Sequence, residues 1–249
     1  MRKEDLVQDL SFLGLRYARI LSKKITREAA EDLKKKYRYI HIYSFDKEDL
    51  PGFDVRVQTT PVFDLSEDLE KIFKNFNDTC KKHIRRGERN PDLKLMADDK
   101  NFSQSYALYK KAKRQEGARP DLAREFKNCI FFNAYYKGEL IVTMSFYDNG
   151  EIIRAKHIAS LRKEMTDEDA KVVAHATRGL NWEAMKWGKA HGRKIFDLAG
   201  VTDDVSKAGI KEFKMSFGGN LTSIYICRYV APIFHIAKKA ANLIGRNIH

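Results

Sequence analysis

The chain has 249 residues, of which 43% are hydrophobic and 33% are charged, and its Gly and Pro residues are few. This composition is typical of a globular protein and excludes a disordered or collagen-like chain. No uncharged apolar run approaches the roughly 18 residues of a membrane-spanning helix, so neither a span nor a secretory leader is expected. The net charge of +13 indicates a surface that attracts anions such as nucleic acid, lipid headgroups or coenzyme A.

Two helices are predicted at the start of the chain. Over residues 6–21 apolar side chains recur at three- and four-residue steps, which favours a helix, and a second helical run covers residues 26–36. Together they would form a helical extension, residues 1–36, in front of one compact domain that takes up residues 37–249.

The rest of the chain mixes strands and helices without the regular alternation of a doubly wound sheet. Runs rich in β-branched and aromatic residues predict strands at 37–44, 55–63, 128–136, 139–147, 152–160, 194–198 and 222–229. Apolar periodicity, caps and glycines predict helices at 67–89, 102–115, 172–191 and 206–215, with a last helix from Pro232.

The middle of the chain carries the strongest local signal. Asp148-Asn149-Gly150 is a typical hairpin turn between two of these strands, and a Lys-Gly pair joins two others. Residues 128–160 should therefore form a three-stranded antiparallel meander. We expect an α+β fold, in which a mostly antiparallel central sheet is flanked by helices and preceded by the two N-terminal helices.

The three cysteines, Cys80, Cys129 and Cys227, lie far apart and have no metal-ligand spacing. An odd number of scattered thiols favours neither a disulfide framework nor a zinc site. We therefore expect reduced thiols, a cytoplasmic location and no bound metal.

The most informative stretch lies near the end of the chain, at residues 194–219. A predicted strand ends at Gly200, where the backbone can approach a ligand closely. The helix that follows places Lys211 and Lys214 on neighbouring positions of one face, so two cations would lie beside the strand end. Without further support, both could be ordinary solvated lysines.

This stretch resembles a known signature. Phe-Asp-Leu-Ala-Gly at 196–200, a variable loop, and Gly-Ile-Lys-Glu-Phe-Lys-Met-Ser-Phe-Gly-Gly at 209–219 are similar to the closing motif of the FemABX peptidyl transferases and their single-domain acetyltransferase-like relatives, which share the GNAT fold. An Ile-Arg-Arg element at 84–86 agrees with this family in order, and the resemblance covers residues 37–230.

The resemblance implies a single GNAT-like domain and an N-acyltransferase that moves an acyl group onto an amine of a cell-envelope or saccharide precursor. FemABX enzymes that act on the cell-wall precursor typically have two GNAT-like units. Because one unit is predicted here, acyl-coenzyme A (acyl-CoA) is the preferred donor. Two alternatives stay open: aminoacyl transfer from tRNA to a peptidoglycan peptide, and a non-catalytic, basic nucleic-acid-binding protein on the same scaffold.

Acetyltransferases of the GNAT superfamily usually bind the coenzyme A pyrophosphate at a helix start, through the motif Arg/Gln-x-x-Gly-x-Gly/Ala. Arg178-Gly179, in the predicted helix at 172–191, matches this motif only in part.

The resemblance also implies roles for individual residues. Lys214 matches the signature lysine and would stabilise the oxyanion of acyl transfer or hold donor phosphate. His157 lies in a strand where some GNAT enzymes place a general base, and together with Asp197 it would orient the acceptor amine. The residues assigned to the donor or its phosphates are Lys211, Arg85, Arg86 and Gly200.

Most of these residues also have a simpler interpretation. Arg85 and Arg86 could form the solvated side of an amphipathic helix, whereas His157 and Asp197 could be buried strand residues. The basic segment from Pro232 could lie on an anionic membrane surface or pack on its own domain.

Overall fold

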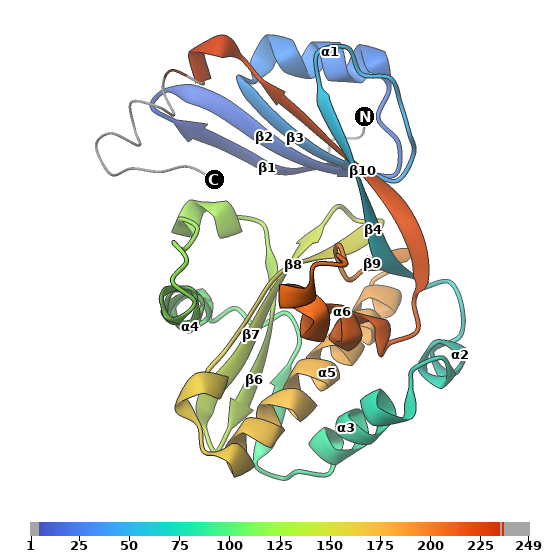
Figure 1. Ribbon diagram of the computed structural model, residues 1–249, viewed down its shortest axis with the longest axis vertical. Coiled ribbons are helices and arrows are strands. Elements are labelled where there is room, and N and C mark those ends of the chain that lie inside the picture. The colour runs from blue at the N-terminus through green and yellow to red at the C-terminus, as the bar shows by residue number, and fades with distance from the viewer. Residues whose placement is uncertain (1–4, 235, 237–249) are drawn as a thin grey trace. The chain divides into compact units, whose positions relative to one another are not determined.

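The computed structural model describes residues 5–234 and residue 236 (Figure 1). Within these residues, no helix combines the length and the apolar character that crossing a bilayer requires. The chain forms two compact units: unit 1 contains the residues up to Thr59 and from Thr222 onward, and unit 2 contains Thr60–Leu221. The boundary expected after residue 36 falls inside unit 1, and most of the helix expected from Pro232 lies outside the described residues.

Unit 1 is a mixed sheet with a helix packed against it. The strands follow in the order β1 (Leu6–Phe12), β2 (Leu15–Ser22), β3 (Tyr39–Ser44) and β10 (Asn220–Val230), and the helix is α1 (Arg27–Lys36). β2 and β3 are parallel, whereas the two outer pairs are antiparallel. Buried Ile20, Ile40 and Ile42 form a core with Leu33 of α1.

The expected pair of N-terminal helices is wrong, because residues 6–21 form a β-hairpin. Leu13 and Gly14 have φ values of 47° and 76°, and positive φ at both positions is what a two-residue hairpin turn needs. The apolar spacing suggested a helix because β2 is buried on both faces over much of its length. It therefore lacks the alternation of apolar and polar residues that marks a half-exposed strand. The run at 26–36 is helical and forms α1, which connects β2 to β3.

Unit 2 is built on a second mixed set of strands, in the order β4-β9-β8-β7-β6-β5. Its strands are the part of β4 (Asp54–Asp64) from Thr60 onward, β5 (Leu93–Met96), β6 (Ile130–Tyr136), β7 (Glu139–Asp148), β8 (Ile152–Ser160) and β9 (Ile195–Asp197). Its helices are α2 (Leu69–Lys74), α3 (Asp78–Glu88), α4 (Phe102–Gln115), α5 (Asp167–Ala190) and α6 (Ala208–Met215), with short 3-10 helices η2 (Ala123–Phe126), η3 (Arg162–Glu164) and η4 (Val205–Lys207).

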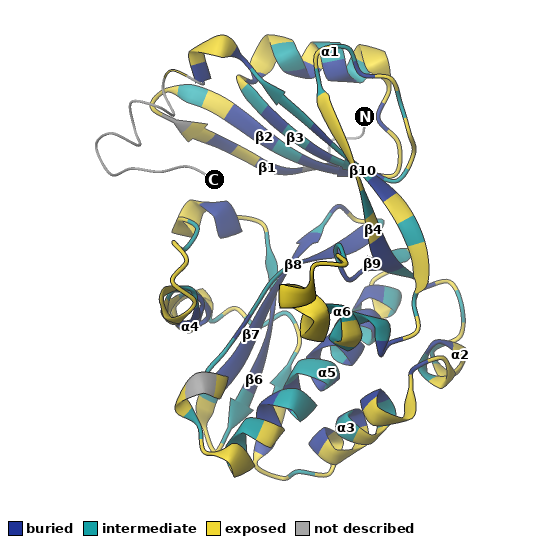
Figure 2. Cartoon of the chain, in the orientation of Figure 1, coloured by how far each residue is buried: buried dark blue, intermediate teal, exposed yellow. Residues whose placement is uncertain are grey.

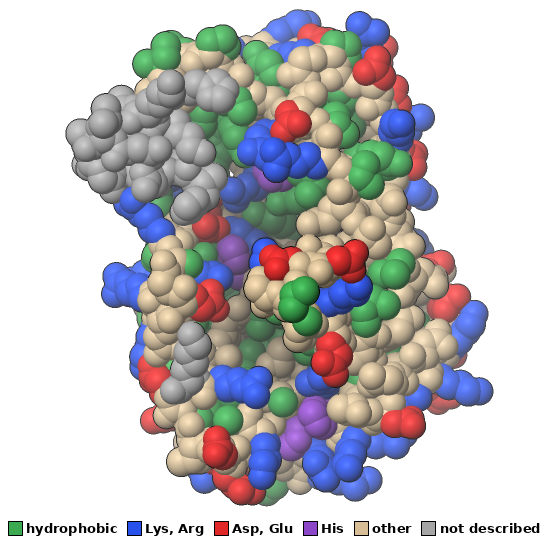
Figure 3. Space-filling view, in the orientation of Figure 1, with side chains coloured by type: hydrophobic (Ala, Val, Ile, Leu, Met, Phe, Trp, Pro, Cys, Tyr) green, Lys and Arg blue, Asp and Glu red, His purple; other side chains and the backbone are tan. Residues whose placement is uncertain are grey.

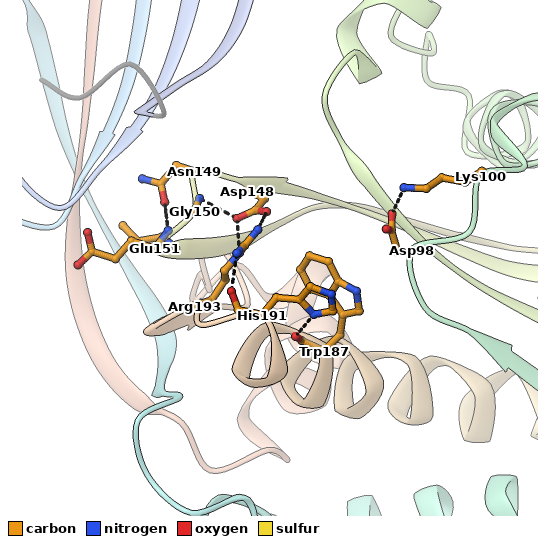
Figure 4. Close-up of polar contacts among 10 residues, drawn as sticks. Asp98, Lys100, Asp148, Asn149, Gly150, Glu151, Trp187, His191 and Arg193 are labelled. Atoms are coloured by element: carbon orange, nitrogen blue, oxygen red, sulfur yellow. Dashed lines mark hydrogen bonds and ion pairs between the residues drawn. The ribbon is translucent and has the colours of Figure 1, made fainter.

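The predicted meander is confirmed, since β6, β7 and β8 pair antiparallel in sequence order. In the turn between β7 and β8, Asn149 Oδ1 accepts a hydrogen bond from the amide of Glu151 (Figure 4). It also accepts one from the amide of Ile152. The guanidinium of Arg193 binds both carboxylate oxygens of Asp148, at 2.9 and 2.5 Å. This pair ties the segment after α5 to the hairpin and helps to set where β9 begins.

The expectation of a mostly antiparallel sheet is wrong, because both units contain a parallel pair. β2 and β3 are parallel, and so are β8 and β9. In each case a helix joins the two strands, α1 in unit 1 and α5 in unit 2. Such a crossover returns the chain to the end of the sheet from which it started, which makes the second strand parallel to the first.

The single helix expected over residues 67–89 is two helices, α2 and α3. Asn75 is the C-cap of α2, and Asn77 caps the first turn of α3 through its side chain. Between the two helices Phe76 is buried, and its ring lies 5.2 Å from that of Phe217 and 5.5 Å from that of Trp182. In unit 2, buried residues gather on β7 and on the side of α5 that packs against the strands (Figure 2).

The chain can leave α6 only through a glycine at position 218. Gly218 has a φ of 66°, and a Cβ there would lie 2.1 Å from the carbonyl oxygen of Asn75. We therefore expect Gly218→Ala to lower the free energy of unfolding by more than about 2 kcal/mol, measured by urea denaturation. Gly209→Ala is the matched control, because a Cβ at this position would meet open space. This substitution should raise the free energy of unfolding by about 0.4 to 1 kcal/mol. Equal effects would contradict this account.

Candidate functional site

A buried charge network holds the end of β9. Asp197 is completely buried, and its Oδ2 pairs with the guanidinium of Arg154, whose side chain is 4% exposed. Its Oδ1 accepts hydrogen bonds from the Thr60 hydroxyl and from the amide of Ala199, the latter at 2.7 Å. Ala199 has a φ of 61°, which is strained for a residue with a Cβ. The carboxylate thus fixes a tight turn and has its lone pairs directed at protein donors.

Lys214 of α6 reaches this turn. Its Nζ donates hydrogen bonds to the carbonyl oxygens of Ala199 and Gly200, at 3.1 and 2.7 Å. Burial and then the charge of Arg154 lower the pKa of Lys214 to about 8, against the opposing effect of Asp197. An ammonium has three N–H donors, and no described residue takes the third.

Lys214 lines a cleft of about 750 Å³ within unit 2. The walls come from α4, β8, α5, the turn after β9, and α6. Apolar groups such as Phe213 and Ile158 line it together with Arg178 and His157. The structure therefore brings Lys214 and His157 to one cleft, with Asp197 and Gly200 in the turn beneath the ammonium.

His157 is held in one orientation. Its Nε2 lies 2.9 Å from Asp121 Oδ2, and its ring lies 4.7 Å from that of Tyr109. Burial lowers the pKa of His157, an effect that the hydrogen bond to Asp121 opposes, so the imidazole is neutral at pH 7. Because a carboxylate only accepts, Nε2 is the donor, and Nδ1 then carries the lone pair.

Three other residues singled out from the sequence lie elsewhere. Lys211 is paired with Asp203 at 2.5 Å on the surface, and it does not line the cleft. Arg85 lies over the ring of Phe73, 5.8 Å from its centroid, beside a separate hollow. Arg86 faces a different hollow, because consecutive helical residues point about 100° apart. The structure does not bring Arg85 and Arg86 into the cleft of Lys214.

The sequence pattern missed Arg154 and Thr60, which complete the network of Asp197. An arginine inside the apolar run of β8 was the available signal, since a buried charge needs a partner. Arg178 was assigned only to a partial pyrophosphate motif. It lies in the middle of α5, where its guanidinium covers the ring of Phe213 at 5.2 Å.

The start of α5 does not suit a pyrophosphate. Thr166 already caps this terminus by accepting a hydrogen bond from the amide of Asp169, and the first turn carries Asp167, Glu168 and Asp169. These carboxylates occupy the positive end of the helix dipole and offset its attraction for an anion, so the helix terminus itself does not form a pyrophosphate site. Gly179 packs against Leu95, so it has a structural role within the helix.

Scans against protein-family models and against curated proteins find no match. Solved structures do match. FemX is 12% identical with a TM-score of 0.61, over 94% of this chain and 84% of that one. The C-terminal domain of an Agrobacterium fabrum protein assigned as a lysylphosphatidylglycerol synthetase is 9% identical with a TM-score of 0.56, over 92% and 82%. L-PGS from Bacillus licheniformis is 13% identical with a TM-score of 0.55, over 93% and 83%. The FemABX-like fold implied by the sequence is confirmed.

Proposed function

We propose that the chain is an acyltransferase that moves an activated acyl group onto an amine, with Lys214 at the reacting carbonyl. The observation that carries this proposal is the buried ammonium of Lys214, which two backbone carbonyls hold at the wall of a cleft. The third N–H of a fixed ammonium is suited to an oxygen that gains negative charge during the reaction. The fold is also that of the FemABX transferases, whose closing motif residues 196–219 resemble.

The chemical step needs few groups. The acceptor amine attacks the carbonyl carbon of the donor, and the charge that develops on the carbonyl oxygen is stabilised by Lys214. Nδ1 of His157 is suited to take the proton that the amine loses and to return it to the leaving oxygen when the ester bond breaks. Asp197 acts indirectly, because it holds the turn whose carbonyls position Lys214.

Two observations favour an aminoacyl ester over acyl-CoA as the donor. Acyl-CoA was preferred because a single GNAT-like unit was predicted, but the fold of this chain covers 84% of FemX. In addition, Thr166 caps the start of α5 and carboxylates offset its dipole, so this terminus does not offer the backbone amides through which acetyltransferases bind the coenzyme A pyrophosphate. We therefore infer an aminoacyl group carried by tRNA, and an acceptor amine on a cell-envelope or saccharide precursor. One matched structure is named for lysylphosphatidylglycerol, an aminoacylated lipid.

The test is a single-turnover transfer assay. Purified protein is mixed with an aminoacylated RNA minihelix or with acetyl-coenzyme A, and with a peptide or amino sugar that carries a free amine. We expect transfer from the minihelix, at a rate that falls as the pH rises through about 8, because Lys214 then loses its proton and its charge. Rates are corrected for spontaneous ester hydrolysis. A rate that keeps rising to pH 9.5 would contradict the role of a charged Lys214.

A further inference from the structure

A second hollow of about 430 Å³ lies in unit 2, between α3, η3 and α5. Its walls carry five basic or titratable nitrogen side chains, His83, Arg86, Arg162, Lys171 and His175. We call it the histidine pocket. In the space-filling view, His side chains surrounded by Lys and Arg gather in the lower part of the face, where α3 and α5 lie (Figure 3).

The positive charges of the histidine pocket are poorly compensated. Arg86 and Arg162 have no ion pair among the described residues, and Lys171 has only an exposed contact with Glu168 at 3.6 Å. Asp167 is the one carboxylate among the lining residues of this hollow, and the other two acidic residues of the first turn of α5, Glu168 and Asp169, do not line it. Cations left without partners around a concavity are the arrangement that binds an anion.

The two histidines of the pocket also experience this excess of positive charge. Their rings lie 5.0 Å apart at an angle of 69°, and Nδ1 of His83 is buried without a hydrogen-bond partner among the described residues. Burial and then the charge of Arg178 lower the pKa of His83 to about 4. Burial and then the charge of Arg86 lower the pKa of His175. Both imidazoles are therefore neutral at pH 7 when no anion is present.

The histidine pocket adjoins the cleft of Lys214. Arg162 and Ala174 line both hollows, and Arg178, which lines the cleft, acts electrostatically on His83. A ligand with an anionic part in the pocket and a carbonyl group in the cleft would thus lie across one short stretch of α5.

We propose that the histidine pocket binds phosphate groups of the activated donor and so places its acyl carbonyl beside Lys214. This inference rests on the proposed acyl transfer and adds the site that holds the donor. Arg86 and Arg162 supply bidentate hydrogen-bond donors for phosphate oxygens, Lys171 supplies a point charge, and the two imidazoles can each add a proton.

Binding should depend on pH through the two imidazoles. The groups facing them are Lys82 and Arg86 on α3, Arg162 on η3, and Asp167, Lys171 and Arg178 on α5. A bound anion offsets these cations and raises the pKa of each imidazole, so the anion should bind more tightly as the pH falls. Sulfate is a suitable probe, because its own charge stays constant over this range.

The experiment measures binding to the full-length protein by calorimetry, with sulfate, a non-acylated RNA minihelix and coenzyme A as separate probes. We expect sulfate to bind about tenfold more tightly at pH 5.5 than at pH 7.5, and His83→Gln with His175→Gln to remove this dependence. The double variant Arg86→Gln with Arg162→Gln should weaken binding of the minihelix by at least about tenfold. If this double variant instead lost binding of coenzyme A, the pocket would still be a phosphate site, and the donor would be nucleotide-linked.

The matched control is Arg85→Gln, which removes the same charge from the neighbouring residue of α3 but lies at another hollow. It should change the affinity for sulfate and for the minihelix by less than about twofold. Equal losses in Arg85→Gln and in the double variant of Arg86 and Arg162, or no binding of any probe, would overturn the proposal. Binding that depends on the pocket in a protein without transfer activity would sink the proposed function and leave the phosphate site standing.

Discussion

Lys214→Met should lower the turnover of acyl transfer by about 100- to 1,000-fold, because it removes one preorganised donor from the developing oxyanion. The loss should appear in turnover, with little change in the affinity for the donor, since the interaction strengthens only in the transition state. The fold should persist. Methionine has a similar length and avoids the cost of a buried charge, which offsets the two lost hydrogen bonds to within about 1 kcal/mol.

Lys211→Met separates this effect from a general loss of positive charge. Lys211 lies on the same helix but is paired with Asp203 at the surface, outside the cleft. We expect turnover within about twofold of the original protein. Single-turnover rates of both variants, together with their urea denaturation curves, provide the comparison. Equal, mild defects would mean that the cleft only attracts anions, and an unchanged rate in Lys214→Met would remove this residue from the mechanism.

Arg154→Met should lower the free energy of unfolding by about 3 to 5 kcal/mol, because it leaves the carboxylate of Asp197 buried without its counter-charge. Urea denaturation measures the loss. Adding Asp197→Asn should recover part of it, since a neutral amide oxygen can still accept from Thr60 and from the amide of Ala199.

An exposed ion pair provides the control for Arg154→Met. Lys71 and Glu67 are paired at 2.9 Å, with side chains 65% and 37% exposed, so Lys71→Met should leave the unfolding midpoint nearly unchanged. If the double variant at Arg154 and Asp197 were no more stable than Arg154→Met alone, the buried charge would not be the cause of the loss.

Local signals predicted the parts of the fold that local chemistry decides. The meander was found because Asp148-Asn149-Gly150 is a turn in itself, and Gly150 has a φ of 82°. The N-terminal hairpin was missed because its apolar spacing also fits a helix, and pairing with β3 decided the outcome. The split at Phe76 was missed for the same reason, since contacts with Trp182 and Phe217 hold it.

The candidate site was predictable only where a motif marked it. Lys214 was found through the signature, and the structure places it at a cleft with His157. Arg154 and Thr60 are far from Asp197 in sequence, and only the pairing of β4 and β8 with β9 brings them together. The sequence of the Ile-Arg-Arg element showed two positive charges but not where their side chains point, because the orientation of α3 decides which hollow each arginine faces.

The order of the units along the chain has a consequence for how the protein is made. Unit 2 is continuous, whereas unit 1 is interrupted by it, and β10 pairs with β3 only after the whole of unit 2 has been synthesised. Until residues 222–230 leave the ribosome, β3 is an unpaired edge that can recruit strands from other chains. A unit 2 that folds promptly would hold the two partners near each other and shorten the effective loop between them. If unit 2 folded slowly, the chain would therefore aggregate through the exposed strand β3 of unit 1.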